Sequence, residues 1–397
     1  MNGAQIKRVL FVSGVPIDLG GIEKTTMEVY RGIDREQLLI DFIVRKPQRG
    51  YFHDEIESYG GRIFNLFEDT YHKGNKKWNI LMDIYSVFSF YKILKTKGPY
   101  SAVHVVYPNL DGFLIIAANI ARVPVRIVHS RNTGFDDKKS PNIVRRCIRK
   151  LGLFFSKKQA THIWGCSRAA CEYMFGKNIM LDKRAEVPQN PVNINKFMNK
   201  PFNKSESCKL LNISSEKINF INVARYASQK NQKFLIDFFT EMLKQNDRVH
   251  LLLTGPGPLE NEIKVYIKKL NIENNVTMLE RNTSIPIALA ASDYFLLPSL
   301  YEGFGNALIE AQAAGIPCFV SDVCQPEPNL GLVEYIPLEK GPKYWANFIL
   351  SWVEKPDDRI VDITRLMDYE VSNVAPRMQK VYLEGIKYEE ARMNKQF

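Results

Sequence analysis

The stretch Tyr294-Phe-Leu-Leu-Pro-Ser-Leu-Tyr-Glu-Gly-Phe-Gly-Asn-Ala-Leu-Ile-Glu310 decides the fold, because it predicts a strand, a loop and a helix in immediate succession. Residues 294–298 are mostly apolar and end in proline, as expected of a short buried strand. Gly303 and Gly305 let the loop that follows come close to a ligand. A helix that begins near Asn306 completes the strand–loop–helix unit from which parallel sheets are built.

This predicted loop and helix form a pocket for an anion. The first turn of a helix leaves backbone N–H groups without partners, and the positive end of the helix dipole points the same way. Gly305, Asn306 and Ala307 would therefore line a site for a diphosphate. Glu302 stands in the loop, and Glu310 lies about one turn into the helix, where a carboxylate can accept hydrogen bonds from two sugar hydroxyls.

Similar strand and helix signals continue on both sides of this stretch. Short apolar runs alternate with segments of helical period, which is typical of strand–helix units on a parallel sheet. The other strands predicted in the second half are residues 218–224, 249–253, 276–279 and 318–320. The strands predicted in the first half are residues 8–12, 39–44, 102–106, 125–129 and 162–165.

The pattern breaks once, over residues 189–204, which are rich in Asn, Pro and Lys and predict an interdomain linker. We expect an N-terminal domain over residues 1–192, a C-terminal domain over 193–373, and a C-terminal helix over 374–397 that packs back on the first domain. The predicted fold class is α/β, with two Rossmann-like domains that face each other across a cleft. Ligands are expected between them, at the carboxyl ends of the strands.

Two cations follow the first predicted strand of the second half. Arg225 and Lys230 lie five residues apart across a predicted strand–helix turn. Fixed cations at this spacing suit the two phosphates of a leaving nucleotide, whose charge grows as the bond breaks. Gly255, in Leu253-Thr-Gly-Pro-Gly-Pro-Leu-Glu260, marks another glycine turn at which the backbone can approach the same ligand.

The segment around Glu302 and Glu310 resembles glycosyltransferase family 4, a family with the GT-B fold. The resemblance is strong over residues 215–325 and thinner over 1–190. The family's pair of glutamates, spaced E-x7-E, is matched within Pro298-Ser-x-x-Glu-Gly and the Glu-Ala-x-Ala-x-Gly-x-Pro that ends at Pro317.

The resemblance implies a role for each matching residue. Glu310 would hold the ribose of a nucleotide-sugar donor, and Glu302 would lie near the transferred sugar. Arg225 and Lys230 match the family's arginine and lysine at the first turn of this domain. Glu280 stands where family members usually have glycine, so the nucleobase slot is expected to differ in shape.

The first half contains two further predicted site elements. Gly20 and Gly21 follow the first strand and open a helix, without the G-x-G-x-x-G pattern of dinucleotide-binding domains. By resemblance, this glycine loop faces the donor phosphates and the acceptor. His129, at the end of a strand, matches a family histidine near the transferred sugar. We assign no catalytic task to His104, because the second histidine of the family's frequent H-x-H is Val106 here.

The composition agrees with a globular protein. The chain has 397 residues with 45% hydrophobic and 24% charged residues, and no apolar run approaches the length of a membrane span. Its six cysteines form no C-x-x-C pair, which favours free thiols in a reducing, cytoplasmic compartment. With no D-x-D motif and no cluster at metal spacing, we expect no metal and no cofactor besides the donor.

A basic segment accounts for part of the net charge of +11. Between Lys138 and Lys158 there are eight Lys or Arg and no acid. On a helical wheel, Ile143, Val144, Cys147, Ile148, Leu151, Phe154 and Phe155 fall on one arc, and most of the basic residues fall opposite. Two interpretations stay open: the apolar arc packs on the sheet with its basic side in solvent, or the basic face meets an anionic membrane surface.

The resemblance implies a retaining glycosyltransferase, which transfers a hexose or N-acetylhexosamine from a UDP-sugar to a lipid-linked or glycan acceptor. It also implies capsule or exopolysaccharide biosynthesis as the setting, and we expect the enzyme at the inner face of the cell membrane. The alternatives are a nucleotide-sugar epimerase or a free-sugar transferase of the same fold, and a catalytically inactive binding protein. Nucleic acid is not an expected partner, because aromatic stacking positions do not interleave with the basic run.

Overall fold

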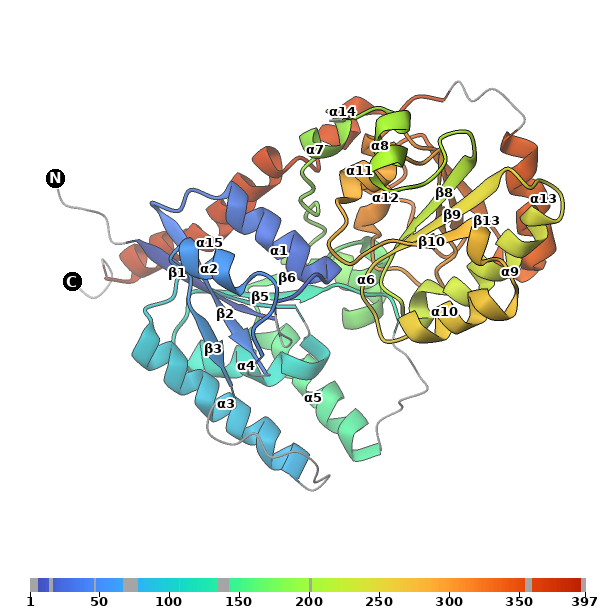
Figure 1. Ribbon diagram of the computed structural model, residues 1–397. Helices are drawn as coiled ribbons and strands as arrows, with labels where there is room; N and C mark the ends of the chain where they lie inside the picture. Colours follow the sequence, from blue (N-terminus) through green and yellow to red (C-terminus); the bar gives the residue numbers. More distant parts are fainter. Residues whose placement is uncertain are drawn as a thin grey trace. The chain divides into compact units, whose positions relative to one another are not determined.

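A computed structural model describes residues 6–13, 17–45, 48–66, 78–106, 108–134, 143–199, 202–353 and 359–393 (Figure 1). The chain divides into two compact units. Unit 1 comprises Met1–Thr133, Asp137–Pro191 and Val371–Phe397, and unit 2 comprises Gly134–Asp136 and Val192–Glu370. Each unit is built around one parallel sheet.

The sheet of unit 1 has seven strands in the order β3-β2-β1-β4-β5-β6-β7. All its described strand pairs are parallel. The strands are β1 (Lys7–Val12), β2 (Leu38–Val44), β3 (Ile63–Asn65), β4 (Ala102–Val105), β5 (Val125–Ser130), β6 (His162–Gly165) and β7 (Ala185–Glu186). Their central residues are almost wholly apolar and buried, as in a sheet with helices on both faces.

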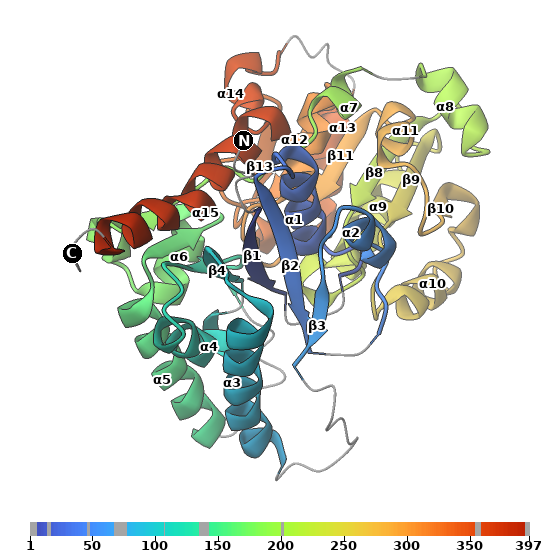
Figure 2. The ribbon, with the colours of Figure 1, turned by 90° about the vertical axis from the view of Figure 1, so that its left-hand side faces the viewer.

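Helices cover both faces of this sheet (Figures 1 and 2). One buried cluster joins the sheet to α1 (Gly21–Gly32), α2 (His53–Ser58) and α15 (Val371–Met393). The other joins it to α3 (Trp78–Lys97), α4 (Pro108–Ile120), α5 (Ile143–Gln159), α6 (Arg168–Phe175) and the short η2 (Ile179–Leu181). α15 lies tightly against α1, because a Cβ on Gly32 would meet the side chains of Val371 and Ala375.

Unit 2 repeats the same plan. Its six-stranded sheet has the order β10-β9-β8-β11-β12-β13. The strands are β8 (Ile218–Val223), β9 (Val249–Thr254), β10 (Val276–Met278), β11 (Tyr294–Leu297), β12 (Cys318–Ser321) and β13 (Val333–Ile336). A buried cluster that includes Trp345 and Phe238 joins this sheet to α9 (Gln232–Leu243), α10 (Glu260–Lys269) and α13 (Gly341–Val353). The other helices among the described residues of unit 2 are α7 (Asn195–Met198), α8 (Lys204–Leu210), α11 (Ile285–Ala290), α12 (Asn306–Ala313), α14 (Ile363–Met367), η3 (Ser228–Lys230), η4 (Glu273–Asn275) and η5 (Leu338–Lys340).

The predicted fold class of two Rossmann-like α/β domains is confirmed. In both sheets the first strand in sequence lies centrally, and the order reverses beside it, which is the doubly wound pattern. All ten predicted strands are present, but β3, β7 and β13 were missed. Each of the three is an edge strand of two to four residues. A strand paired on one side needs only a short apolar run, so its signal in the sequence is weak.

The segment predicted as a linker has a fixed structure where it is described. The chain passes from unit 1 to unit 2 between Pro191 and Val192. The Glu370 carboxylate accepts hydrogen bonds from the backbone N–H groups of Ile194 and Asn195 at the start of α7. Within the described residues, no helix is long and apolar enough to cross a membrane.

Candidate functional site

The strand order of unit 2 reverses between β8 and β11. β8 and β11 are neighbours, and the chain leaves them toward opposite edges of the sheet. In open α/β sheets, ligands bind outside the carboxyl ends of strands at such a point. The predicted residues Arg225 and Lys230 follow β8, and Glu302 follows β11.

An ion pair joins the two loops at this switch point. The Lys230 ammonium donates a hydrogen bond to the Glu302 carboxylate across 2.5 Å, and both side chains are largely buried. The Gln229 side chain donates to the carbonyl of Tyr301, and the Gln229 carbonyl accepts from the N–H of Leu300. These contacts fix the lysine and the glutamate relative to each other within unit 2.

A third loop packs against the β8 turn through glycines. Gly255 has a φ of +135°, and a Cβ there would lie 2.3 Å from the carbonyl oxygen of Ala224. A Cβ on Gly257 would lie equally close to the carbonyl oxygen of Tyr226. Only glycine permits this approach of two backbones. Gly255 therefore shapes the loop that carries Arg225, whose side chain is exposed.

The helix after β11 begins where the sequence predicted. Gly305 adopts the left-handed conformation (φ +90°) at the N-cap, and α12 runs from Asn306. Asn306 and Ala307 occupy its first turn and are half-buried, as is Glu310 one turn further on. The first-turn N–H groups of α12 thus lie in the same segment as Glu302, an arrangement suited to an anion.

Glu302 also affects the chemistry of a buried thiol. Burial raises the pKa of Cys324 to about 12, and the negative charge of Glu302 adds to the rise. Cys324 therefore stays a neutral thiol at physiological pH. It serves as a small buried side chain rather than as a nucleophile.

Unit 1 places the predicted His129 in a buried aromatic cluster. His129 is fully buried at the end of β5, and its ring stacks on that of His104 with centroids 5.2 Å apart. The two rings share a hydrogen bond of 3.0 Å between Nδ1 of His129 and Nε2 of His104. His104 Nδ1 in turn contacts the Tyr382 hydroxyl of α15 at 2.8 Å, and Trp164 meets both imidazoles edge-on.

Burial makes this histidine pair neutral. Desolvation lowers the pKa of both His104 and His129 well below the ordinary value, and the nearby charge of Arg131 acts in the same direction. Nε2 of His129 is buried and has no hydrogen-bond partner among the described residues. The sequence interpretation gave His104 no catalytic task and missed Tyr382, which lies 278 residues from His104 along the chain.

A carboxylate lies against the predicted glycine turn of unit 1. Gly20 is the N-cap of α1, and the buried Glu23 lies in the first helical turn. A Cβ on Gly20 would fall 2.0 Å from a carboxylate oxygen of Glu23, whereas Gly21 has open space around its Cα. The α1 N-terminus is thus already supplied with a negative charge, a feature that the sequence interpretation did not consider.

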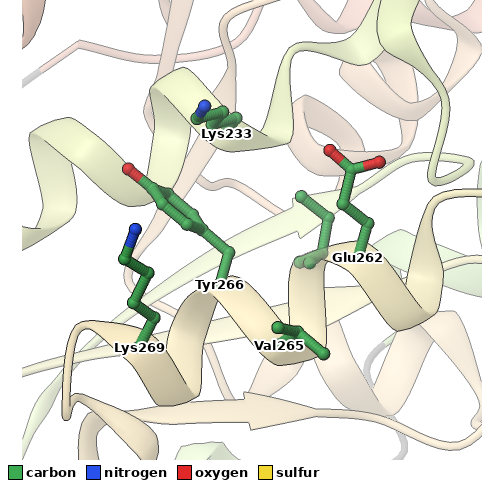
Figure 3. Close-up of a pocket in the computed structure, with 6 residues that line it drawn as sticks. Lys233, Glu262, Val265, Tyr266 and Lys269 are labelled. Carbon is green, nitrogen blue, oxygen red and sulfur yellow. The ribbon is translucent and has the colours of Figure 1, made fainter.

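A shallow pocket of unit 2 lies elsewhere, between α9 and α10 (Figure 3). Lys233, Glu262, Tyr266 and Lys269 line it, and the Tyr266 hydroxyl donates to the Asp237 carboxylate. None of the predicted site residues contributes to it. We regard it as a surface depression between two helices.

Comparison with known proteins decides the family. Residues 203–330 match the family described as "Glycosyl transferases group 1". The "Putative glycosyltransferase EpsF" of Bacillus subtilis is 32% identical over 356 residues, which cover 88% of this chain and 88% of that protein. The chain belongs to the group 1 glycosyltransferases. It is therefore an enzyme of the glycosyltransferase class.

Two further proteins extend the comparison of this group 1 glycosyltransferase. The "UDP-Gal:alpha-D-GlcNAc-diphosphoundecaprenol alpha-1,3-galactosyltransferase" of Escherichia coli is 28% identical over 80% of this chain and 79% of its own length. The crystal structure of Anabaena HepE in complex with UDP and glucose superposes with a TM-score of 0.67 at 18% identity, covering 98% of this chain and 100% of that one. The latter likeness shows the fold, which is GT-B.

Proposed function

We propose that the enzyme is a retaining glycosyltransferase that takes a hexose or N-acetylhexosamine from a UDP-sugar. The acceptor is a lipid-linked or polysaccharide glycan, in capsule or exopolysaccharide biosynthesis. The observation that carries the proposal is the Lys230–Glu302 ion pair at the switch point of unit 2, with the α12 N-terminus in the same loop. A similar protein crystallised with UDP, and another named for a UDP-sugar and a diphosphoundecaprenol-linked acceptor, support the choice of donor and acceptor.

The charges of unit 2 suit a leaving nucleoside diphosphate. Arg225, Lys230 and the first-turn N–H groups of α12 would neutralise the negative charge that grows as the bond between the anomeric carbon and the phosphate oxygen breaks. These groups would act without a metal ion or other cofactor. Glu310 would accept hydrogen bonds from the ribose hydroxyls. Gly255 and Gly305 would let the backbone approach the donor.

In the transfer step, the oxygen of the acceptor hydroxyl bonds to the anomeric carbon on the face that the diphosphate leaves. Its proton passes to an oxygen of the departing phosphate. Glu302 would lie beside the transferred sugar, and its pairing with Lys230 sets its position before the donor binds. His129 and the Gly20–Gly21 turn would act from unit 1. His129 would use Nε2, which has no hydrogen-bond partner in the described part of the chain.

We propose that the enzyme acts as a peripheral membrane protein on the cytoplasmic face of the membrane. The six cysteines are free, in keeping with a reducing compartment. The membrane contact would use the basic segment that ends at Lys158. Residues 138–142 of that segment lie outside the described residues, and the rest of it belongs to α5.

A donor screen tests this proposal. The purified chain is heated with each of a panel of nucleotide sugars, and a bound donor should raise the melting temperature in a concentration-dependent way. Hydrolysis and transfer products are then identified with and without a lipid-linked acceptor. Stabilisation by UDP and its sugars, with retained anomeric configuration in the product, supports the proposal. An isomerised sugar without acceptor would mean that the enzyme is an epimerase.

A further inference from the structure

Helix α5 carries large apolar side chains on its outer side. Leu151 is 53% exposed, Phe154 is 61% exposed and Phe155 is 37% exposed, and Cys147 is also exposed. The rings of Phe154 and Phe155 contact each other edge-on, with centroids 5.5 Å apart. Of the two interpretations left open by the sequence, packing of this apolar arc on the sheet is wrong for these four residues.

The opposite side of α5 explains this orientation. A Cβ on Gly112 of α4 would lie 2.4 Å from the carbonyl oxygen of Gly152, and a Cβ on Gly152 would meet the Phe113 ring. Gly152 and Ser156 are buried, and Leu153 packs against the core of unit 1. Small residues thus let the two helices approach closely, and the large residues are left outside. Figure 2 shows α3, α4 and α5 grouped in unit 1.

Positive charge lies beside the exposed apolar residues. Arg146, Lys150 and Lys158 are exposed on the same helix. At 100° per residue, Lys150 falls next to Phe154, and Lys158 falls between Phe154 and Leu151. No Asp or Glu occurs from Lys138 to Lys158. An anionic surface with an apolar layer beneath it would match both properties, because apolar side chains enter that layer while lysine stems extend to the headgroups.

We propose that the outer face of α5, formed by Leu151, Phe154, Phe155, Lys150 and Lys158, docks the enzyme on an anionic lipid bilayer. The 17-residue helix would lie in the plane of the membrane interface, with its aromatic residues among the acyl chains. This proposal deepens the proposed function, since a lipid-linked acceptor would be met at the same surface. Its test, however, measures membrane binding without any transfer reaction.

The first experiment measures co-sedimentation of the full chain with vesicles. One set contains phosphatidylglycerol and phosphatidylcholine in equal parts, and the other contains phosphatidylcholine alone. The wild type should bind the anionic vesicles more tightly. The double variant L151S/F154S should weaken that binding at least about tenfold. The matched control V265S/Y344S changes two exposed apolar residues of unit 2 and should bind as the wild type does.

Charge variants test the electrostatic part. K150E and K158E should each lower the affinity for anionic vesicles about fivefold or more, with little effect on phosphatidylcholine vesicles. Lys264 of α10 is also exposed, and K264E should change neither. Equal binding by L151S/F154S and the wild type, or no vesicle binding by the wild type, would overturn the proposal.

A variant that keeps the surface apolar tests membrane insertion with less risk of misfolding. F154W should show a blue-shifted emission on anionic vesicles and quenching by brominated acyl chains. Unchanged emission would count against insertion of α5. Stabilisation by UDP serves as the fold control for every variant. If UDP stabilises the variants while vesicle binding is unaffected, docking fails alone; if vesicles bind but UDP never stabilises, the donor proposal fails alone.

Two other occupants of this face would give different results. Sedimentation velocity that shows a wild-type dimer, dissociated by L151S/F154S, would assign the face to a second copy of the chain. Binding to a DNA duplex that K150E abolishes and L151S/F154S preserves would assign it to a polyanion. Either result would overturn membrane docking.

Discussion

The two units share one strand order, yet the residues at their switch points differ in charge. In unit 2 the loops after β8 and β11 bring a lysine and a glutamate into contact, beside an exposed arginine. In unit 1, β4 carries His104, which pairs with His129 and Tyr382 in a buried and neutral cluster. The same topology therefore supplies unit 2 with a lysine and a glutamate in contact. It supplies unit 1 with a neutral histidine pair and, after the neighbouring β1, with the buried carboxylate of Glu23. Topology sets the position of a site, and the side chains set its chemistry.

The largest expected effect of a single substitution is at Lys230. Lys230→Ala removes a cation from the switch point and breaks its ion pair with the largely buried Glu302. Transfer should fall about 100- to 1,000-fold, because this cation is aimed at charge that develops in the transition state. Steady-state kinetics with the best donor of the screen measures the loss.

The control for this variant is Lys264→Ala, which removes an exposed lysine of α10 in the same unit. Its activity should equal that of the wild type. Near-normal kcat/KM in Lys230→Ala would mean that the charge of Lys230 does not stabilise the leaving group. The difference in charge between the two units would then have no functional meaning.

A smaller effect is expected at Glu310, which we assign to the ribose of the donor. Glu310→Ala removes hydrogen bonds to a charged acceptor, worth about 1.5–3 kcal/mol, so the affinity for UDP should fall about 10- to 100-fold. Calorimetric titration with UDP measures this change. Glu262→Ala, at an exposed position of α10, is the matched control. An unchanged affinity in Glu310→Ala would remove the ribose assignment.

The candidate site of unit 2 was accessible from the sequence because its determinants are local. Strand, glycine loop, helix start and both glutamates occur within 294–310, and the two cations follow one predicted strand. The cluster of unit 1 depends on a contact between residues 104 and 382, which no local pattern reveals. The orientation of α5 was equally hidden, because the close contact of Gly112 with Gly152 decides it rather than the hydrophobic periodicity.

Removing the Tyr382 hydroxyl should have a moderate effect on stability. Tyr382→Phe leaves Nδ1 of the buried His104 without its partner, which should lower the free energy of unfolding by about 2 kcal/mol. Urea denaturation measures the change. Tyr344 is 44% exposed in unit 2, and Tyr344→Phe should have no effect. A neutral Tyr382→Phe would show that the hydroxyl does not support the histidine pair.

The smallest effect expected for a single residue is a dependence of stability on pH that comes from the buried histidines. Burial lowers the pKa of His104 and His129 well below the ordinary value, so both stay neutral in the folded protein while the unfolded chain binds protons below about pH 6.5. Because the unfolded state takes up more protons, the free energy of unfolding should fall by about 1.4 kcal/mol per histidine for each pH unit below that value. His250 in unit 2, whose pKa burial lowers to about 4, adds to the slope, as do His53 and His162 of unit 1, whose pKa values burial also lowers. His250→Gln therefore isolates the share of unit 1. Urea denaturation at several pH values measures the slope of the free energy of unfolding against pH. If this slope vanishes in His250→Gln, burial does not keep the histidine pair of unit 1 neutral. The contrast between the two switch points is then smaller than the structure indicates.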